Sequence, residues 1–156
     1  MEQPKAALVT GAGRRIGRAI ALGLAADGWR VAVHYGASRE DAEATVADIC
    51  EAGGYAVAVQ ADLADTASLD ALIPQAAEAL GPLSCLVNNA SVFENDRMQD
   101  FTQHSWDRHM RINLLAPALL TQAFARQHPH GQAGNVINIL DQRVWRLTPR
   151  YISYTL

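Results

Sequence analysis

The sequence predicts an α/β fold in which a doubly wound parallel sheet carries helices on both faces. Short apolar runs alternate with segments whose apolar residues recur near helical spacing, along all 156 residues. Such alternation is typical of parallel strands joined by helices, and right-handed crossovers place those helices on both faces of the sheet. No change in composition marks a second domain, so we expect residues 1–156 to form a single domain.

Each element carries local signals. The runs predicted to be strands occupy residues 5–11, 29–35, 55–63, 83–91 and 134–140. The segments predicted to be helices occupy residues 14–28, 38–54, 65–81 and 100–128. Gly28 marks the end of the first helix, and Ser38 and Asp65 are the expected caps of the second and third. Pro117 lies inside the last helix and, because it lacks a backbone donor, predicts a kink there.

Composition and charge exclude several classes of function. A hydrophobic fraction of 49% and a charged fraction of 19% are those of a folded globular protein. The net charge of -3 gives no attraction to nucleic acid or to an anionic membrane, and no apolar run is long enough to span a bilayer. Cys50 and Cys85 lie in no metal or redox spacing, so we expect two buried, reduced thiols, no metal site and a cytoplasmic protein.

A glycine-rich turn follows the first predicted strand, as TGAGRRIG at residues 10–17. Gly11 permits a tight turn, and Gly17 lets the following helix pack close to the strand. The free amides at the start of that helix then face an anion, for which a pyrophosphate is the usual ligand. Because the turn lies directly between a strand and a helix, nucleotide binding is favoured over a turn that binds nothing.

The chain resembles the short-chain dehydrogenase/reductase family over essentially its whole length. The family pattern T-G-x-x-x-G-x-G is present as TGAGRRIG, with Arg15 in place of its second glycine. The other family motifs follow in order, as ADL at 61–63, NNAS at 88–91, Asn113 in the long helix and Tyr154 after the fifth strand. This resemblance implies a Rossmann-type fold that binds a nicotinamide cofactor.

The predicted cofactor is NADPH. Folds that prefer NAD usually carry an acid at the end of the second strand, and VAVHYGASRE has none at that tip. His34, Ser38 and Arg39 follow there instead. Arg14 and Arg15 lie nearby in the glycine loop, so a 2′-phosphate would meet cations and hydroxyl donors. The resemblance implies further cofactor contacts, at Gly11, Ile16, Gly17, Asp62, Leu63, Asn89, Ala90 and Ser91.

Tyr154 is the expected proton donor. In this family the tyrosine of Y-x-x-x-K delivers the proton, the lysine lowers its pKa, and an asparagine, here Asn113, supports a water relay. Tyr151 competes for the role, but YISYTL resembles the family's approach to this motif and favours Tyr154. Asp141, thirteen positions before Tyr154, occupies the place of the family's usual serine. An ionised carboxylate only accepts hydrogen bonds, so Asp141 suits an amino-heterocycle better than a ketone oxygen, unless burial raises its pKa and makes it an acid.

Within the family, the chain resembles the pteridine reductases. Arg15, HYGAS after the second strand, NNASVF after the fourth, and Asp141 with Tyr154 all agree with that branch. There, a pterin ring stacks between the nicotinamide and an aromatic residue, whose position here is Phe93. The resemblance also implies that Arg15 and Asp141 contact the substrate, whereas Phe93 as a simple core residue is the alternative.

The motif lysine would lie four positions after Tyr154, and the sequence ends at Leu156. We therefore expect a sheet truncated after its fifth strand, with the C-terminal part of the family domain absent. The leading hypothesis is an NADPH-dependent reductase that transfers hydride to a dihydropterin. A carbonyl (3-oxoacyl) reductase and an NADP-binding protein without catalysis are the alternatives. The family further implies a small-molecule substrate and a homo-oligomer, either a tetramer or a dimer.

Overall fold

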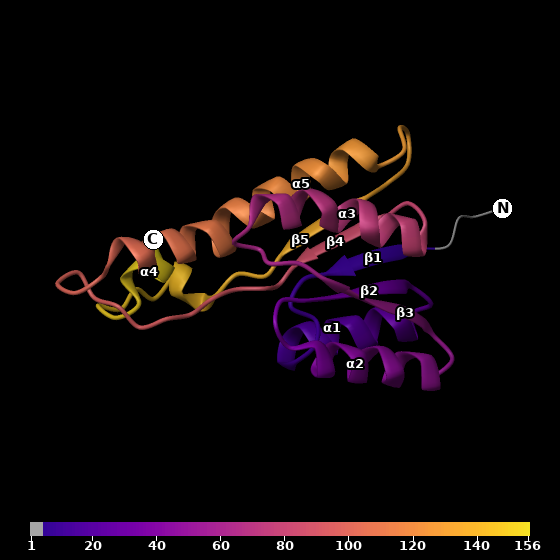
Figure 1. Ribbon diagram of the computed structural model, residues 1–156, viewed down its shortest axis with the longest axis horizontal. Helices are drawn as coiled ribbons and strands as arrows, with labels where there is room; N and C mark the ends of the chain where they lie inside the picture. The colour runs from indigo at the N-terminus through magenta and orange to yellow at the C-terminus, as the bar shows by residue number, and fades with distance from the viewer. Residues whose placement is uncertain (1–4) are drawn as a thin grey trace.

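A five-stranded parallel sheet lies between two layers of helices in the computed structural model, which describes residues 5–156 (Figure 1). The strand order is β3-β2-β1-β4-β5, and every neighbouring pair is parallel. The strands are β1 (Ala6–Val9), β2 (Arg30–Tyr35), β3 (Tyr55–Gln60), β4 (Cys85–Asn88) and β5 (Asn135–Asn138). Each lies inside a predicted run, and the predicted doubly wound α/β fold is confirmed.

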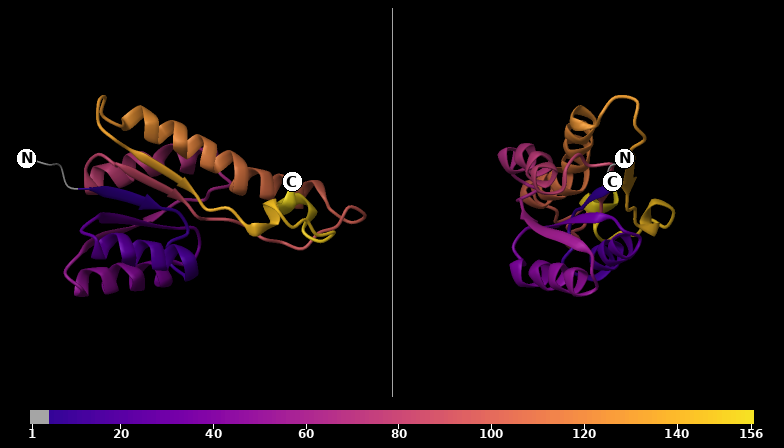
Figure 2. Two further views of the ribbon diagram at one scale, coloured as in Figure 1. Left: turned by 180° about the vertical axis from the view of Figure 1, so that it is seen from behind. Right: turned by 90° about the vertical axis from the view of Figure 1, so that its right-hand side faces the viewer.

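The helices divide between the two faces of the sheet. One face is covered by α1 (Arg15–Ala26) and α2 (Arg39–Glu51), and the other by α3 (Thr66–Leu80) and α5 (Ala116–Gln127) (Figure 1). The remaining elements are α4 (Gln103–His109), the π-helical η1 (Met110–Leu115), the 3-10 helix η2 (Gln142–Val144) and α6 (Ile152–Thr155). The C-terminal segment folds back to lie near α4, beyond the ends of the strands (Figure 2).

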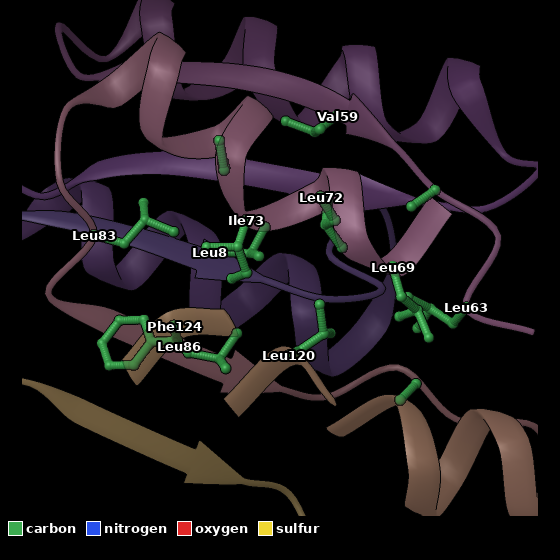
Figure 3. Packing of buried hydrophobic residues seen from close by; sticks show 14 of the residues in the cluster. Leu8, Val59, Leu63, Leu69, Leu72, Ile73, Leu83, Leu86, Leu120 and Phe124 are labelled. Atoms are coloured by element: carbon green, nitrogen blue, oxygen red, sulfur yellow. The ribbon is translucent and has the colours of Figure 1, made fainter. Parts of the chain in front are cut away.

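Strand β1 is buried on both faces. Ala6 and Leu8 belong to the apolar cluster under α3 and α5, and Ala7 and Val9 belong to the cluster under α1 and α2. Figure 3 shows the first cluster, which combines Leu8 of β1 with Leu72 and Ile73 of α3 and Phe124 of α5. Burial of alternate side chains on opposite faces explains why β1 is a continuous apolar run rather than an alternating one.

The predicted helix over 100–128 is divided into α4, η1 and α5. Thr102 caps its start in a reciprocal pair with Ser105. Pro117 lies in the first turn of α5, directly after the π-helical turn. Because proline cannot donate to the carbonyl four residues earlier, which is that of Asn113, the regular ladder is interrupted there. The signal at Pro117 therefore marks a change of helix type, and Asn113 lies within it.

Three smaller expectations have different outcomes. Asp65 caps α3 as predicted, because its side chain accepts a hydrogen bond from the Ser68 backbone. Ser38 is the N-cap residue of α2, but its hydroxyl makes no capping hydrogen bond. Cys85 is buried, whereas Cys50 is exposed on α2, so the prediction of two buried thiols is wrong for Cys50. No helix within residues 5–156 is long and apolar enough to cross a membrane.

The close approach of α1 to the end of β1 gives a matched pair of glycine tests. A Cβ at Gly17 would lie 2.2 Å from the Gly11 carbonyl oxygen, whereas a Cβ at Gly23 would meet nothing within 4 Å. Gly17→Ala should lower the free energy of unfolding by roughly 1–3 kcal/mol, because the contact is with rigid backbone. Gly23→Ala should raise it by up to about 1 kcal/mol through helix propensity. Urea denaturation measures both, and equal stabilities for the two variants would contradict this packing.

Candidate active site

The end of β1 is joined to the end of β4 by side chains. The Asn89 amide nitrogen donates to the carbonyl oxygens of Thr10 and Gly11, at 2.9 and 3.2 Å. The Thr10 hydroxyl oxygen accepts from the backbone nitrogens of Asn89 and Ala90, each at 3.0 Å. These bonds hold the glycine loop against the segment that follows β4. Thr10 was not among the predicted site residues, although it precedes Gly11 in the motif.

The start of α1 suits an anion. Arg15 has a φ of 52°, a left-handed conformation that favours glycine, and this is the position where the family pattern has glycine. No acidic residue lies in the first turn of α1, whose free amides and helix dipole attract negative charge. Arg14, Arg15 and Ile16 are all exposed there, and Arg14 Nε lies 3.3 Å from Asp41 Oδ2.

His34 has a different role from the expected one. Its ring is buried, its Nδ1 accepts a hydrogen bond from the Gly11 backbone at 3.0 Å, and its Nε2 lies 3.1 Å from the Ala61 carbonyl oxygen. Because Nδ1 accepts, Nε2 carries the proton and donates to Ala61. Burial also lowers the pKa of the imidazole. His34 is therefore neutral and links the glycine loop to the residue that follows β3, so it offers no cation to a 2′-phosphate. Its contact with the cofactor stays a prediction.

The other residues predicted to bind the adenosine end of the cofactor follow β2 and β3. Arg39 is exposed and lies 3.5 Å from Glu43, a pair that contributes little in solvent. Ser38 is half-buried beside it. The Asp62 carboxylate accepts from the Ala64 backbone at 2.9 Å, and the Leu63 side chain is buried in the core. Contacts of these four residues with a cofactor stay a prediction.

Asp141 and Tyr154 are brought together. Asp141 follows β5 and caps η2, with Oδ1 accepting from the Arg143 backbone at 2.9 Å. Its other oxygen, Oδ2, accepts a hydrogen bond from the Tyr154 hydroxyl at 3.0 Å. Burial, together with the hydrogen bond and charge of Asp141, raises the pKa of Tyr154 to about 12. This is the opposite direction from the lowered pKa expected of a tyrosine assisted by a lysine, because the carboxylate disfavours the phenolate.

Phe93 lies in an aromatic cluster with both tyrosines. Its ring stacks on that of Tyr151, with centroids 4.1 Å apart and planes at 16°, and meets that of Tyr154 at 4.7 Å and 75°. Arg143 Cζ lies 5.1 Å from the Phe93 centroid and 4.9 Å from the Tyr151 centroid, so it sits beside this stack. The structure thus places Phe93 next to Tyr154, with one face of its ring covered by Tyr151.

A pocket of about 640 Å³ opens between α5, β5 and α6. This volume suits a small organic ligand. Five predicted site residues line it, namely Ala90, Ser91, Asn113, Asp141 and Tyr154. The Asn113 amide makes paired hydrogen bonds to the Val92 backbone, at 2.8 and 2.9 Å, and so fixes the segment after β4. A water relay at Asn113 stays a prediction.

A buried polar cluster that no sequence motif indicated lies next to Tyr154, whose ring centroid is 6.1 Å from that of His109. It consists of Asp96, His109 and Ser153, which come from three separate segments. Burial opposes ionisation of the Asp96 carboxyl, but hydrogen bonds from Ser153 and Ser105 outweigh it and hold its pKa below the ordinary value. No spacing in the sequence links these residues, and only the tertiary fold brings them together.

Comparisons with known proteins identify the family. Residues 5–155 match the short chain dehydrogenase family. The chain belongs to this family. It is 42% identical over 135 residues to an uncharacterized oxidoreductase of Methylorubrum extorquens, covering 86% of this chain and 54% of that protein. It is 38% identical over 139 residues to a 3-oxoacyl-(acyl-carrier-protein) reductase of Staphylococcus aureus, covering 89% of this chain and 56% of that protein.

The solved structures include a similar protein with a bound cofactor. The FolM alternative dihydrofolate reductase 1 from Brucella canis, complexed with NADP, matches with a TM-score of 0.92 and 42% identity, over 97% of this chain and 60% of that one. The present chain therefore spans about half the length of the curated relatives it matches. The predicted family is confirmed, and the pteridine reductase branch stays a prediction.

The contact between Asp141 and Tyr154 can be tested by titration. Asp141→Asn should lower the pKa of Tyr154 from about 12 toward that of an ordinary tyrosine, because it removes the negative charge that disfavours the phenolate. Burial remains, so the pKa should stay above the ordinary value. The measurement is the ultraviolet absorbance of tyrosinate as a function of pH. Subtracting the absorbance of the same protein with the added Tyr154→Phe substitution leaves the titration of Tyr154 alone. An unchanged titration would show that Asp141 does not act on this hydroxyl.

Proposed function

We propose that this chain is the cofactor-binding part of an NADPH-dependent reductase that transfers hydride to a pterin-like substrate, such as a dihydropterin. The observation that carries the proposal is the hydrogen bond between Tyr154 and Asp141 on the wall of a ligand-sized pocket. A hydroxyl that can move a proton and a carboxylate that can accept hydrogen bonds then face the same space. Reduction of a C=N bond requires a proton in addition to the hydride.

The glycine loop and the start of α1 fit the phosphates of NADPH. The close contact of Gly17 with the Gly11 carbonyl brings the first helical amides near the end of β1. Arg14 and Arg15 add positive charge beside them, and no acid follows directly after β2 to repel a 2′-phosphate. NADPH supplies the hydride when it is bound. Because His34 is neutral, the positive charges that favour the phosphorylated cofactor are those of Arg14, Arg15 and Arg39.

Asp141 favours a pterin over a ketone. A ketone oxygen needs a hydrogen-bond donor, and an ionised carboxylate has none to give. The amino group and ring N–H groups of a pterin are donors, which a carboxylate can accept. Tyr154 holds its proton at neutral pH, because its pKa is raised to about 12. For delivery, the Tyr154 hydroxyl must turn from Asp141 to the substrate, and a cation near the phenolate would then lower the cost of releasing the proton.

The similar proteins support both leading candidates. A dihydrofolate reductase with bound NADP at 42% identity favours a pterin-like substrate and NADPH. The 3-oxoacyl reductase at 38% identity keeps a carbonyl reductase as the second candidate. Asp141 and the aromatic cluster around Phe93 count against that candidate. An NADP-binding protein without catalysis is the third. A cytoplasmic location and a homo-oligomer complete the proposal.

Tyr154→Phe tests the proton donor in the full-length protein. Turnover of a dihydropterin should fall by roughly a hundredfold or more, because general acid catalysis is lost. NADPH affinity should be unchanged, since the hydroxyl lies on the pocket wall while the phosphates bind at the glycine loop. The measurements are steady-state oxidation of NADPH and cofactor titration by fluorescence. Unchanged turnover would rule out Tyr154 as the donor.

Asp141→Ser tests the substrate class. Serine restores a hydroxyl donor for a ketone oxygen and removes the acceptor for a pterin amino group. The ratio of kcat/KM for a dihydropterin to kcat/KM for a simple ketone should therefore fall. Asp107→Asn, at an exposed position on α4, is the control for loss of a carboxylate. If pterin reduction is unaffected by Asp141→Ser, Asp141 does not bind the substrate.

A further inference from the structure

The residues just before Tyr154 are anchored to a buried carboxylate. Asp96, His109 and Ser153 are 5%, 1% and 2% exposed. The Ser153 hydroxyl contacts Asp96 Oδ2 and lies 2.8 Å from His109 Nδ1. The Ser105 hydroxyl lies 3.1 Å from the same carboxylate oxygen. Asp96 comes from the segment after β4, His109 from α4 and Ser153 from α6, so the cluster joins three separate parts of the chain.

The direction of the hydrogen bonds follows from one contact. The Glu94 backbone nitrogen, which can only donate, lies 3.1 Å from His109 Nε2. Nε2 must therefore accept, and His109 is neutral with its proton on Nδ1. Nδ1 then donates toward Ser153 Oγ and the Ser105 carbonyl oxygen, which lies 2.9 Å away. The Ser153 hydroxyl is left to donate to Asp96.

This order does not suit a nucleophilic serine. In a hydrolytic triad the serine donates to the histidine and the histidine donates to the acid. Here the histidine donates to the serine and the serine donates to the acid, and His109 Nε2 is already occupied by the Glu94 backbone. Ser153 is also buried away from any substrate. The cluster therefore holds structure and does not perform acyl transfer.

Asp96 binds the backbone of the three residues that precede Tyr154. Its carbonyl oxygen accepts from the Tyr151 nitrogen at 2.7 Å and from the Ile152 nitrogen at 3.4 Å. Its carboxylate accepts from the Ser153 nitrogen at 3.2 Å. Tyr151 has a φ of 61°, an unfavourable conformation for an aromatic residue that the surroundings must impose. A helix as short as α6 does not form by itself in water. The carbonyl oxygen of Asp96 therefore holds the turn at Tyr151, and its carboxylate holds the start of α6.

We propose that Asp96 is a positioning residue that, through Ser153 and the neutral His109, fixes the Tyr154 hydroxyl against Asp141. The expected effect on turnover rests on the proposed function. The expected effect on the position of the Tyr154 ring does not. Loss of the buried carboxylate would remove its bonds to the backbone nitrogen and the hydroxyl of Ser153, and so free the start of α6. Tyr154, the next residue, would then leave both Asp141 and the ring of Phe93. Displacement of a reacting group by about 1 Å can lower the rate roughly a hundredfold.

The test compares Asp96→Asn with Asp100→Asn in the full-length protein. Asp100 lies in the same segment and is exposed, and its contact with the Arg97 backbone can be kept by asparagine. The readouts are the NMR resonance of the labelled Tyr154 ring, assigned with Tyr154→Phe, and kcat and KM for NADPH oxidation. Asp96→Asn should shift the Tyr154 resonance and lower kcat by roughly tenfold to a hundredfold, with the KM for NADPH unchanged. Asp100→Asn should change neither readout.

The outcomes separate positioning from stability and from the proposed function. A lower melting temperature with an unshifted Tyr154 resonance and unchanged kcat would overturn the proposal. If Asp96→Asn does not fold, Ser153→Ala provides the same test, because it removes the hydroxyl and keeps the backbone bond to Asp96. If Tyr154→Phe is fully active, the proposed function fails, and the Tyr154 resonance alone still decides whether Asp96 positions this ring.

Discussion

The burial of β1 on both faces, between two parallel neighbours, is the constraint on which the site depends. β2 and β4 both pair with β1 in parallel, β3 pairs in parallel with β2, and β5 pairs in parallel with β4, so all five strands end at the same edge of the sheet. The glycine loop follows β1, the segment of Asn89 to Asp96 follows β4, and Asp141 follows β5. Parallel pairing therefore gathers the segments that bear the candidate site, which lie far apart in the sequence.

Two kinds of contact then give that edge its chemistry. Asn89, Thr10 and His34 hold the glycine loop with hydrogen bonds that carry no net charge, and they leave the helical amides free for an anion. On the other side, burial and the Asp141 carboxylate keep Tyr154 protonated. The site therefore combines an attractive end for phosphate with a protonated hydroxyl at the reacting end. In the proposed function, the phosphates of NADPH would bind at the first end and Tyr154 would supply the proton at the second.

The fold was largely predictable because its signals are local. Alternating apolar runs, the glycine turn and the Asp65 cap each act within a few residues, and each lies where it was expected. The conjunction of Asp141 and Tyr154 also followed from motif positions. The role of His34 did not, because its neutrality depends on Gly11 and Ala61, which lie on other segments. The Asp96 cluster could not be predicted either, because its burial is set by tertiary packing. Pro117 did indicate an interruption of the long helix, but not the π-helical turn at Asn113.

The most direct test of the central claim compares two substrates with NADPH and the full-length protein. The measurement is kcat/KM for a dihydropterin and for a 3-oxoacyl thioester, under the same conditions. The carboxylate of Asp141 beside Tyr154 predicts that the dihydropterin is the better substrate. Preference for the thioester would contradict the pterin assignment, and tight NADPH binding without turnover of either would leave only the cofactor-binding function.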